Sequence, residues 1–166
     1  QAPLSDAAFF AISGLNRDDE TPEDYVGVLR EAKARNLDFI CANPDIVVQH
    51  GDRTIWCAGA IARDYEALGG KVIMAGKPFA PIYDLARQEL TQIAGREIEA
   101  SRILCIGDGV VTDIAGANAR GLDSLFIAAG IHGEALWTNG KLDPAKVDAA
   151  LAAENVRATY AMAALT

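Results

Sequence analysis

A lysine and two aspartates follow apolar segments at positions where a parallel sheet would bring them together. Lys77 follows the apolar residues 72–75, while Asp108 follows residues 103–106 and Asp113 comes just beyond it. Ligands of open parallel sheets bind beyond the carboxyl ends of the strands, so these three side chains are expected at one edge. Lysine neutralises phosphate oxygens, and Mg²⁺ takes one or two protein carboxylates together with a substrate phosphate. The pattern therefore indicates a site for a phosphate group and a magnesium ion.

These residues need a framework of strands and helices, and the apolar pattern predicts one. Apolar runs between turn-forming residues predict strands, and apolar residues at helical spacing predict helices. Strands are expected at residues 8–12, 37–42, 72–75, 103–106 and 124–128, and helices at 25–35, 58–68, 78–94, 112–120 and 144–153. Residues 46–48 and 54–56 flank a turn-like segment, which predicts a hairpin.

The order of elements from residue 72 onward predicts an α/β fold. Residues 103–106 and 124–128 are almost entirely apolar, which is typical of strands buried on both faces. Together with residues 72–75 they give a β-α-β-α-β order, which predicts one parallel sheet with right-handed crossovers and helices on both sides. The helix at 78–94 is expected to carry its apolar residues on one face, namely Ile82, Ala86, Leu90 and Ile93.

Several other kinds of site are excluded by counting residues. A dinucleotide fingerprint requires a third glycine where Thr112 stands, and a P-loop requires glycine and a hydroxyl residue where Lys71 and Pro78 stand. His50 and His132 are too far apart in the sequence to share a helix face, so a zinc site built on them is not expected. A G-x-S-x-G nucleophile motif is absent.

Amino-acid composition limits which partners the protein could bind and in which compartment it would be found. The 15 basic and 23 acidic residues give a net charge of -8, so nucleic acid and anionic membranes would repel the protein. No window approaches the ~18 consecutive apolar residues of a membrane span, and no signal peptide is expected. Three cysteines without a C-x-x-C motif suit buried thiols in a reducing compartment. A cytoplasmic protein with no nucleic-acid or membrane partner is therefore expected.

Three motifs in the same order resemble those of a known superfamily. Gly76-Lys77-Pro78 and the run from Gly107-Asp108-Gly109 to Asp113 resemble the third and fourth motifs of the haloacid dehalogenase phosphohydrolases. Cys41-Ala42-Asn43-Pro44-Asp45 resembles the Thr-Asn-Pro-Asp signature of their class IIA, NagD-like branch. The resemblance implies an α/β chain made of part of an inserted α/β cap, residues 1–70, and the C-terminal half of a Rossmann-like core with a parallel sheet, residues 71–166. The boundary is expected near Gly69-Gly70.

The resemblance also implies an activity and a role for each motif residue. It implies a Mg²⁺-dependent phosphomonoesterase that acts on a small phosphorylated metabolite through an aspartyl-phosphate, with a possible homo-oligomer through the cap. Lys77 would be catalytic and would bind substrate together with Asn43 and Asp45. Asp108 and Asp113 would hold the metal. Members of the superfamily begin with a D-x-D nucleophile motif, which occurs nowhere in these 166 residues. The isolated chain is therefore expected to be an inactive part of an enzyme.

Structural interpretations compete with these functional ones. Asn43-Pro44-Asp45 is ordinary turn chemistry, and Asp113 suits the first turn of a helix because the helix dipole stabilises an acid there. Trp56 and Trp137 are expected to pack rather than to stack on a ligand, and His132 is expected to be a loop residue. A non-catalytic module that binds phosphate and a cation is the alternative function. A receiver or flavodoxin-like domain is disfavoured because no acidic cluster follows the first strand.

Overall fold

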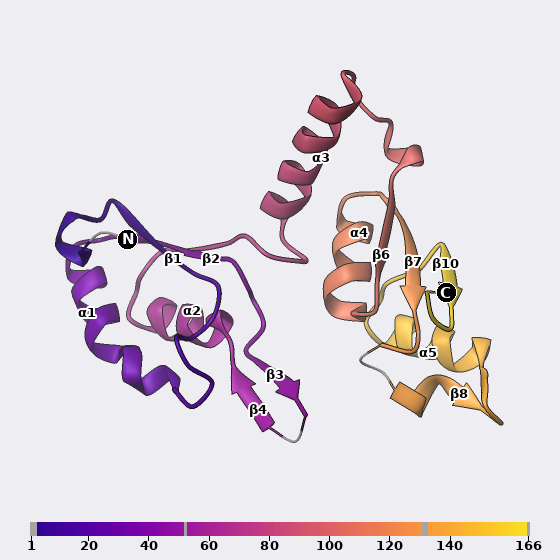
Figure 1. The fold of residues 1–166 in the computed structure, drawn as a ribbon, viewed down its shortest axis with the longest axis horizontal. Coiled ribbons are helices and arrows are strands. Elements are labelled where there is room, and N and C mark those ends of the chain that lie inside the picture. Colours follow the sequence, from indigo (N-terminus) through magenta and orange to yellow (C-terminus); the bar gives the residue numbers. More distant parts are fainter. Residues whose placement is uncertain (1–2, 52, 131–132, 166) are drawn as a thin grey trace. The chain divides into compact units, whose positions relative to one another are not determined.

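The computed structural model describes residues 3–51, 53–130 and 133–165, which form two compact units (Figure 1). The first unit comprises residues 1–76 and the second residues 77–166. The predicted boundary lies near Gly69-Gly70, whereas the units divide after Gly76. The difference arises because the strand that follows Gly69-Gly70 is hydrogen-bonded into the sheet of the first unit.

The first unit is built on a parallel three-stranded sheet in the order β1-β2-β5. Its strands are β1 (Phe9–Ile12), β2 (Asp38–Cys41) and β5 (Val72–Met74), and its helices are α1 (Val26–Ala34) and α2 (Ala58–Ala67). The predicted hairpin is confirmed as β3 (Val47–His50) paired with β4 (Arg53–Trp56). Short 3-10 turns at Leu4–Asp6 and Pro22–Tyr25 complete the unit.

The start of α1 illustrates how local sequence shapes this unit. Pro22 occupies the first position of the turn that leads into the helix, and the Thr21 amide donates to Asp24 Oδ2 at 2.8 Å. This reciprocal capping satisfies an amide that the helix itself leaves without a partner. Residues local in the sequence therefore cap the turn that leads into α1.

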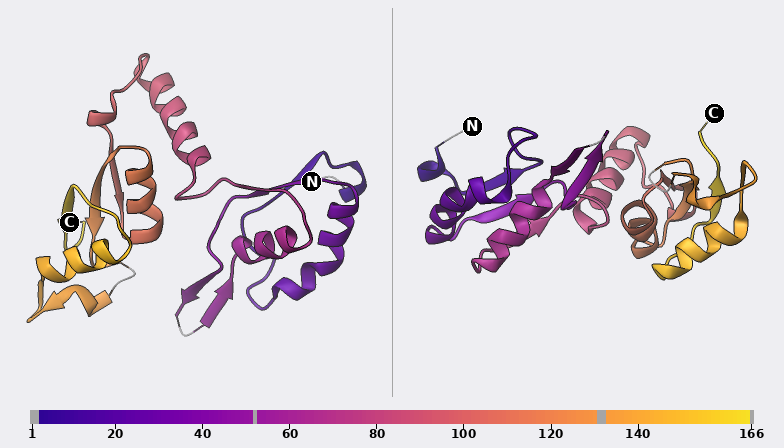
Figure 2. Two further views of the ribbon diagram at one scale, coloured as in Figure 1. Left: turned by 180° about the vertical axis from the view of Figure 1, so that it is seen from behind. Right: turned by 90° about the horizontal axis from the view of Figure 1, so that it is seen from below.

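Both helices of the first unit cover the same face of its sheet (Figures 1 and 2). Phe39 of β2 is fully buried between Leu29 of α1 and the ring of Tyr65 on α2. The Tyr65 hydroxyl donates to the carbonyl of Leu37 at 2.6 Å, so its polar end is satisfied inside the core. The alternate residues of the strands face away from this core, and Phe9 remains 55% exposed.

The second unit is built on another parallel sheet, in the order β10-β7-β6. Its strands are β6 (Leu104–Gly107), β7 (Asp123–Ile127) and β10 (Tyr160–Met162), with a small antiparallel hairpin of β8 (Trp137–Thr138) and β9 (Lys141–Leu142). Its helices are α3 (Ala80–Ala94), α4 (Ala115–Ala119) and α5 (Pro144–Ala153). A π-helical turn at Val110–Ile114 leads into α4, and 3-10 turns lie at Ala100–Arg102 and Gly133–Leu136.

Two expectations about the sheet are wrong. The segment 72–75 was expected to share one sheet with 103–106 and 124–128, but β5 pairs with β2 while β6 pairs with β7. The apolar pattern shows that a segment is a buried strand, and it cannot specify which parallel neighbour the strand will pair with.

The second error concerns the faces of β6. Helices on both sides were expected, yet the core of the second unit gathers on the face of Phe126, with Ile114 and the α5 residues Val147 and Leu151. Leu104 and Ile106 of β6 point to the other face and are 44% and 51% exposed. No described helix of this unit covers these two side chains. The apolar pattern of a strand does not show whether a helix packs on its second face.

Helix α3 also departs from expectation, because none of its residues is fully buried. Ile82 and Ile93 of its apolar face are 40% and 83% exposed. Within the unit the half-buried ring of its residue Tyr83 lies directly against Gly116 of α4. In the part of the chain that the structure describes, no helix is both long and apolar enough to cross a membrane.

Candidate active site

Lys77 and Asp113 form an ion pair at the carboxyl end of β6. The Lys77 ammonium donates to Asp113 Oδ1 at 2.5 Å. The lysine side chain is 53% exposed, while that of Asp113 is only 10% exposed. A buried carboxylate with an exposed lysine beside it leaves the positive charge accessible to an anion that approaches from solvent. The structure thus brings together two of the predicted site residues.

The turn after β6 is shaped around the Asp113 carboxylate. Its second oxygen, Oδ2, accepts a hydrogen bond of 3.0 Å from the Gly109 amide. A β-carbon added at Gly107 would collide with the carboxyl group of Asp113, and one at Gly109 would collide with the Thr112 hydroxyl. Glycines are therefore required here because the turn closes tightly over Asp113. The glycines that flank Asp108 are explained by this packing.

Asp108 occupies the position between these two glycines and is half-buried. Its side chain lies against Gly130, where an added β-carbon would collide with the carboxyl group. Gly130 follows β7, and β6 and β7 are parallel neighbours with Gly107 opposite Phe126. The ends of the two strands thus meet at Asp108, which places it at the same sheet edge as Asp113.

Asp108 and Asp113 are the two carboxylates that would belong to the predicted magnesium site. Both oxygens of Asp113 already accept hydrogen bonds, from Lys77 and from Gly109, so Asp113 suits support of the ion through an intervening group. Asp108 offers the hard oxygen ligand that Mg²⁺ prefers. Among the described residues no group of three or more His, Cys, Asp or Glu side chains is placed to hold a metal. The chemistry of the two aspartates fits an ion that takes few protein ligands.

Asn43 and Asp45 lie in the first unit, in the turn between β2 and β3. The side-chain oxygen of Asn43 accepts from the Asp45 amide at 3.2 Å, which is an Asx turn. The Asp45 carbonyl accepts from the amide of Gly59 at the start of α2, and Gly76 leaves no room for a β-carbon beside Pro44. The turn is therefore tightly packed, with Asn43 half-buried and Asp45 exposed. A role for either residue in binding substrate stays a prediction.

Tyr83 is a residue near this site that sequence analysis missed. Burial raises its pKa to about 12, and the negative charges of Cys105 and Asp113 act in the same direction. The helical pattern pointed instead to the aliphatic residues of α3. The small residue Gly116 in the facing helix, where a ring can approach closely, is the signal that could have revealed this contact.

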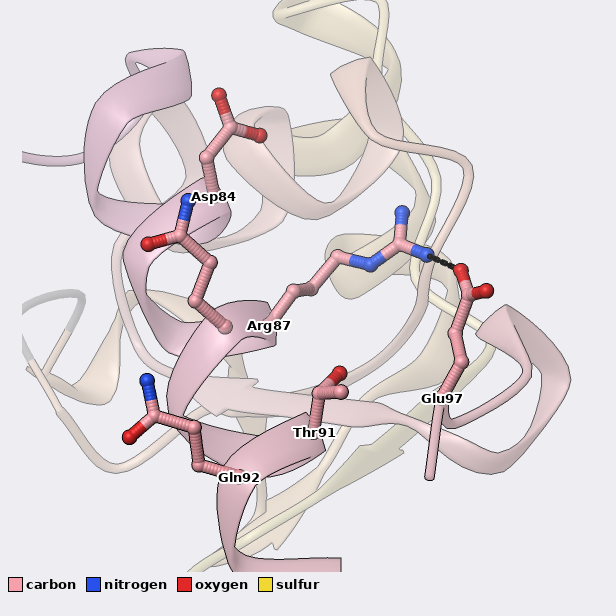
Figure 3. A pocket seen from close by; sticks show the side chains of 6 residues that line it. Asp84, Arg87, Thr91, Gln92 and Glu97 are labelled. Carbon is pink, nitrogen blue, oxygen red and sulfur yellow. Dashed lines mark hydrogen bonds and ion pairs between the residues drawn. The ribbon is translucent and has the colours of Figure 1, made fainter. Parts of the chain in front are cut away.

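A hollow of about 670 Å³ lies along the polar side of α3 (Figure 3). Arg87 reaches across it to Glu97, with their charged atoms 3.3 Å apart, and Thr91 lies beneath them. No predicted site residue lines this hollow. His132, which was interpreted as a loop residue, lies outside the described residues.

Comparisons with known proteins agree with the motifs. The family model described as HAD-hydrolase-like matches residues 74–158, which is more than half of the chain. A haloacid dehalogenase-like hydrolase from Brucella suis 1330 is 46% identical over 100% of the chain, with a TM-score of 0.71. A p-nitrophenyl phosphatase from Archaeoglobus fulgidus, 22% identical over 97% of the chain with a TM-score of 0.70, shares the fold.

The chain spans little more than half of these structures, 58% of the Brucella protein and 55% of the Archaeoglobus protein. No curated protein matched the chain. The residues that match the family model, 74–158, include Lys77, Asp108 and Asp113. The order of the three motifs, the paired Lys77 and Asp113, and these matches place the chain in the haloacid dehalogenase-like hydrolase family.

Proposed function

We propose that this chain is part of a magnesium-dependent phosphomonoesterase that acts on a small phosphorylated metabolite. The observation that carries the proposal is the ion pair of Lys77 with the buried Asp113, at the strand end that also carries Asp108. The Lys77 ammonium group is oriented by Asp113 and remains exposed to solvent, which suits it to bind phosphate oxygens. Membership of a hydrolase family supports the same reaction class.

Each residue of this site would have its own role in the reaction. Lys77 binds phosphate oxygens and stabilises the charge that grows on them in the transition state. Asp113 orients Lys77, because its carboxylate is itself held by the Gly109 amide. Asp108 would hold the magnesium ion, with Asp113 supporting it. When bound, the ion would neutralise phosphate charge and polarise the phosphorus centre.

The nucleophile lies outside these 166 residues in this proposal. The sequence contains no D-x-D, and the solved relatives are longer than this chain. In the complete enzyme an aspartate would attack phosphorus to give an aspartyl-phosphate. The first unit would act as part of a cap that selects the leaving group through Asn43 and Asp45, and could join two copies of the protein. A cytoplasmic location belongs to the same proposal and is supported by three free thiols.

A non-catalytic module that binds phosphate and a cation is the second candidate. The absence of D-x-D from the sequence is the observation that favours it. Such a module would retain Lys77, Asp108 and Asp113 for binding and would need no nucleophile.

Phosphate release by the complete protein of the parent gene separates the two candidates. The enzyme should release phosphate from monoesters in the presence of Mg²⁺ and lose that activity with a chelator. Its gene should encode D-x-D upstream of the segment shown here. A complete protein that binds phosphate but releases none from a broad panel of monoesters would establish the non-catalytic module instead.

A further inference from the structure

A pocket that none of the predicted site residues lines opens beyond the end of β7. Its volume is about 580 Å³, which is large enough for a small organic group. It lies wholly within the second unit and is lined by Ala129, Glu134, Trp137, Asn139 and Gly140. Trp137 is predicted to pack, and its half-buried indole does contact the core of this unit. The same residue also faces the pocket.

One residue that lines the pocket is the sequence neighbour of a glycine that Asp108 contacts. Ala129, which lines it, is followed by Gly130, against which the Asp108 side chain lies. Because β6 and β7 run parallel and end together, the residues that follow them share one edge of the sheet. A molecule with its phosphate near Asp108 and Lys77 would therefore have this pocket beside it.

The far wall of the pocket is a hairpin that the rest of the unit holds in place. Trp137 and Thr138 of β8 pair with Leu142 and Lys141 of β9. The Trp137 carbonyl accepts from Lys146 Nζ at 2.6 Å, and the Thr138 hydroxyl donates to Asp143 at 2.7 Å. Both of these partners lie at the start of α5, so the hairpin is anchored to a helix. A wall held in this way can position a ligand without first becoming ordered.

The lining residues define what the pocket would accept. The indole of Trp137 provides a flat apolar surface for a ring. The Glu134 carboxylate accepts hydrogen bonds, and the Asn139 amide both accepts and donates them. No lysine or arginine is among the described residues that line the pocket. A flat ring with hydroxyl or amino groups is therefore favoured, and a carboxylate is disfavoured by the charge of Glu134.

We propose that this pocket binds the leaving group of the phosphate monoester, and that the leaving group is a ring with hydrogen-bond donors and no carboxylate. Trp137 stacks on the ring and Glu134 accepts from its donors. The proposal rests on the proposed function for the idea that a phosphate lies beside Asp108. It differs from that proposal by assigning ring recognition to the core unit and not only to the cap.

The first experiment measures binding without any phosphate, using the 166-residue chain. Trp56→Phe leaves Trp137 as the one tryptophan. Addition of 4-hydroxybenzyl alcohol should then change Trp137 fluorescence in a saturable way. The carboxylate analogue 4-hydroxybenzoate should bind about tenfold more weakly, equivalent to about 1.4 kcal/mol. Glu134→Gln should reduce that preference. Equal affinity for the two compounds, or no saturable change, would overturn the proposal.

The second experiment uses the complete enzyme and two phosphate esters. Trp137→Leu should raise KM for 4-(hydroxymethyl)phenyl phosphate about tenfold and leave KM for glycerol 1-phosphate unchanged, because the acyclic ester has no ring to stack. Trp137→Phe should restore much of the loss, which a merely unfolded variant could not do. If both esters lose activity equally, Trp137 supports the fold and the pocket has no role in recognition.

The two experiments also separate failure of this inference from failure of the proposed function. A chain that binds the ring alcohol within a complete protein that hydrolyses no phosphate ester would refute the phosphatase and keep the pocket. If the complete protein is an active phosphatase and its Trp137→Leu variant has the native KM for both esters, the role of the pocket is refuted and the proposed function is kept.

Discussion

Lys77 Nζ and Asp113 Oδ1 lie 2.5 Å apart although 36 positions separate the two residues in the sequence. The Asp113 side chain is buried and also accepts a hydrogen bond from the Gly109 amide. The Lys77 ammonium is therefore oriented by a carboxylate that is itself held in place. An exposed lysine on a flexible stem would lose much more rotational freedom on binding phosphate. The pair therefore provides an ammonium group that is oriented before any anion binds.

Replacement of this lysine should affect catalysis more than stability. In the complete enzyme Lys77→Met should lower kcat ~10²-fold or more, because a transition-state charge loses its partner. The free energy of unfolding should fall by only about 1 kcal/mol, since the lysine is half-exposed. Steady-state kinetics and thermal melting of the same variant measure both quantities.

Lys71→Met is the matched control, because Lys71 forms an ion pair of equal length, 2.5 Å, with Asp38 in the first unit. It should change stability by a similar or smaller amount and leave kcat unchanged. If Lys77→Met melts far below the native protein while the control does not, Lys77 is needed for folding and the catalytic assignment is wrong.

Asp108 should govern the response to magnesium. Asp108→Asn in the complete enzyme should sharply reduce activity at low Mg²⁺ and raise the concentration of Mg²⁺ needed for half-maximal activity, because an amide oxygen carries no charge for the cation. Asp84→Asn, in the polar hollow along α3, is the control and should respond to Mg²⁺ as the native enzyme does. An unchanged response in Asp108→Asn would remove this residue from the metal site.

The 166-residue chain by itself should release no phosphate from p-nitrophenyl phosphate above background. Lys77 and the two aspartates can orient a phosphate, but no D-x-D is present to form the covalent intermediate. A colorimetric assay with and without Mg²⁺ tests this. Turnover that survives further purification and is lost in Lys77→Met would show that the chain carries its own nucleophile.

Gly116 should tolerate no side chain, because Tyr83 occupies the space that a β-carbon would need. Gly116→Ala should lower the free energy of unfolding by about 1–3 kcal/mol, as overpacking does. The loss should be smaller in a Tyr83→Leu background, where the aromatic ring is gone. Denaturant unfolding of the single and double variants measures the coupling.

Gly27→Ala is the control for this substitution. Gly27 lies in α1 with nothing near its missing side chain, so alanine should leave stability unchanged or raise it by up to about 1 kcal/mol. Additive losses from Gly116→Ala and Tyr83→Leu would mean that the two side chains do not compete for the same space.

Tyr83 should make the second unit sensitive to alkali. Its pKa in the folded protein is raised to about 12 from 10.0, chiefly because burial disfavours the phenolate. The unfolded chain therefore loses this proton first as pH rises. The stabilising contribution is fully present below pH 10 and is lost as pH rises toward 12. Tyr83→Phe should show a smaller loss of stability over that interval in urea unfolding; an identical loss would exclude Tyr83 as the group responsible.

The sequence alone was sufficient to predict strands β1 to β7 and helices α1 to α5, but not strands β8, β9 and β10. The hairpin of residues 47–56 depends on neighbouring residues, so a local pattern predicted it. Lys77 and Asp113 do meet, but not at the edge of one shared sheet as expected, because β5, which precedes Lys77, pairs with β2 and not with β6. Family membership followed from the order of the motifs.

Tertiary structure alone decided which strands pair, which faces are covered and where a pocket forms. β5 joins β2, and Ile106 stays half-exposed, because strand pairing and burial depend on partners distant in the sequence. The pocket of Glu134 and Trp137 depends on a short hairpin anchored to α5 by Lys146. A two-residue strand carries almost no periodic pattern, and its position comes from long-range hydrogen bonds that no local window of sequence contains.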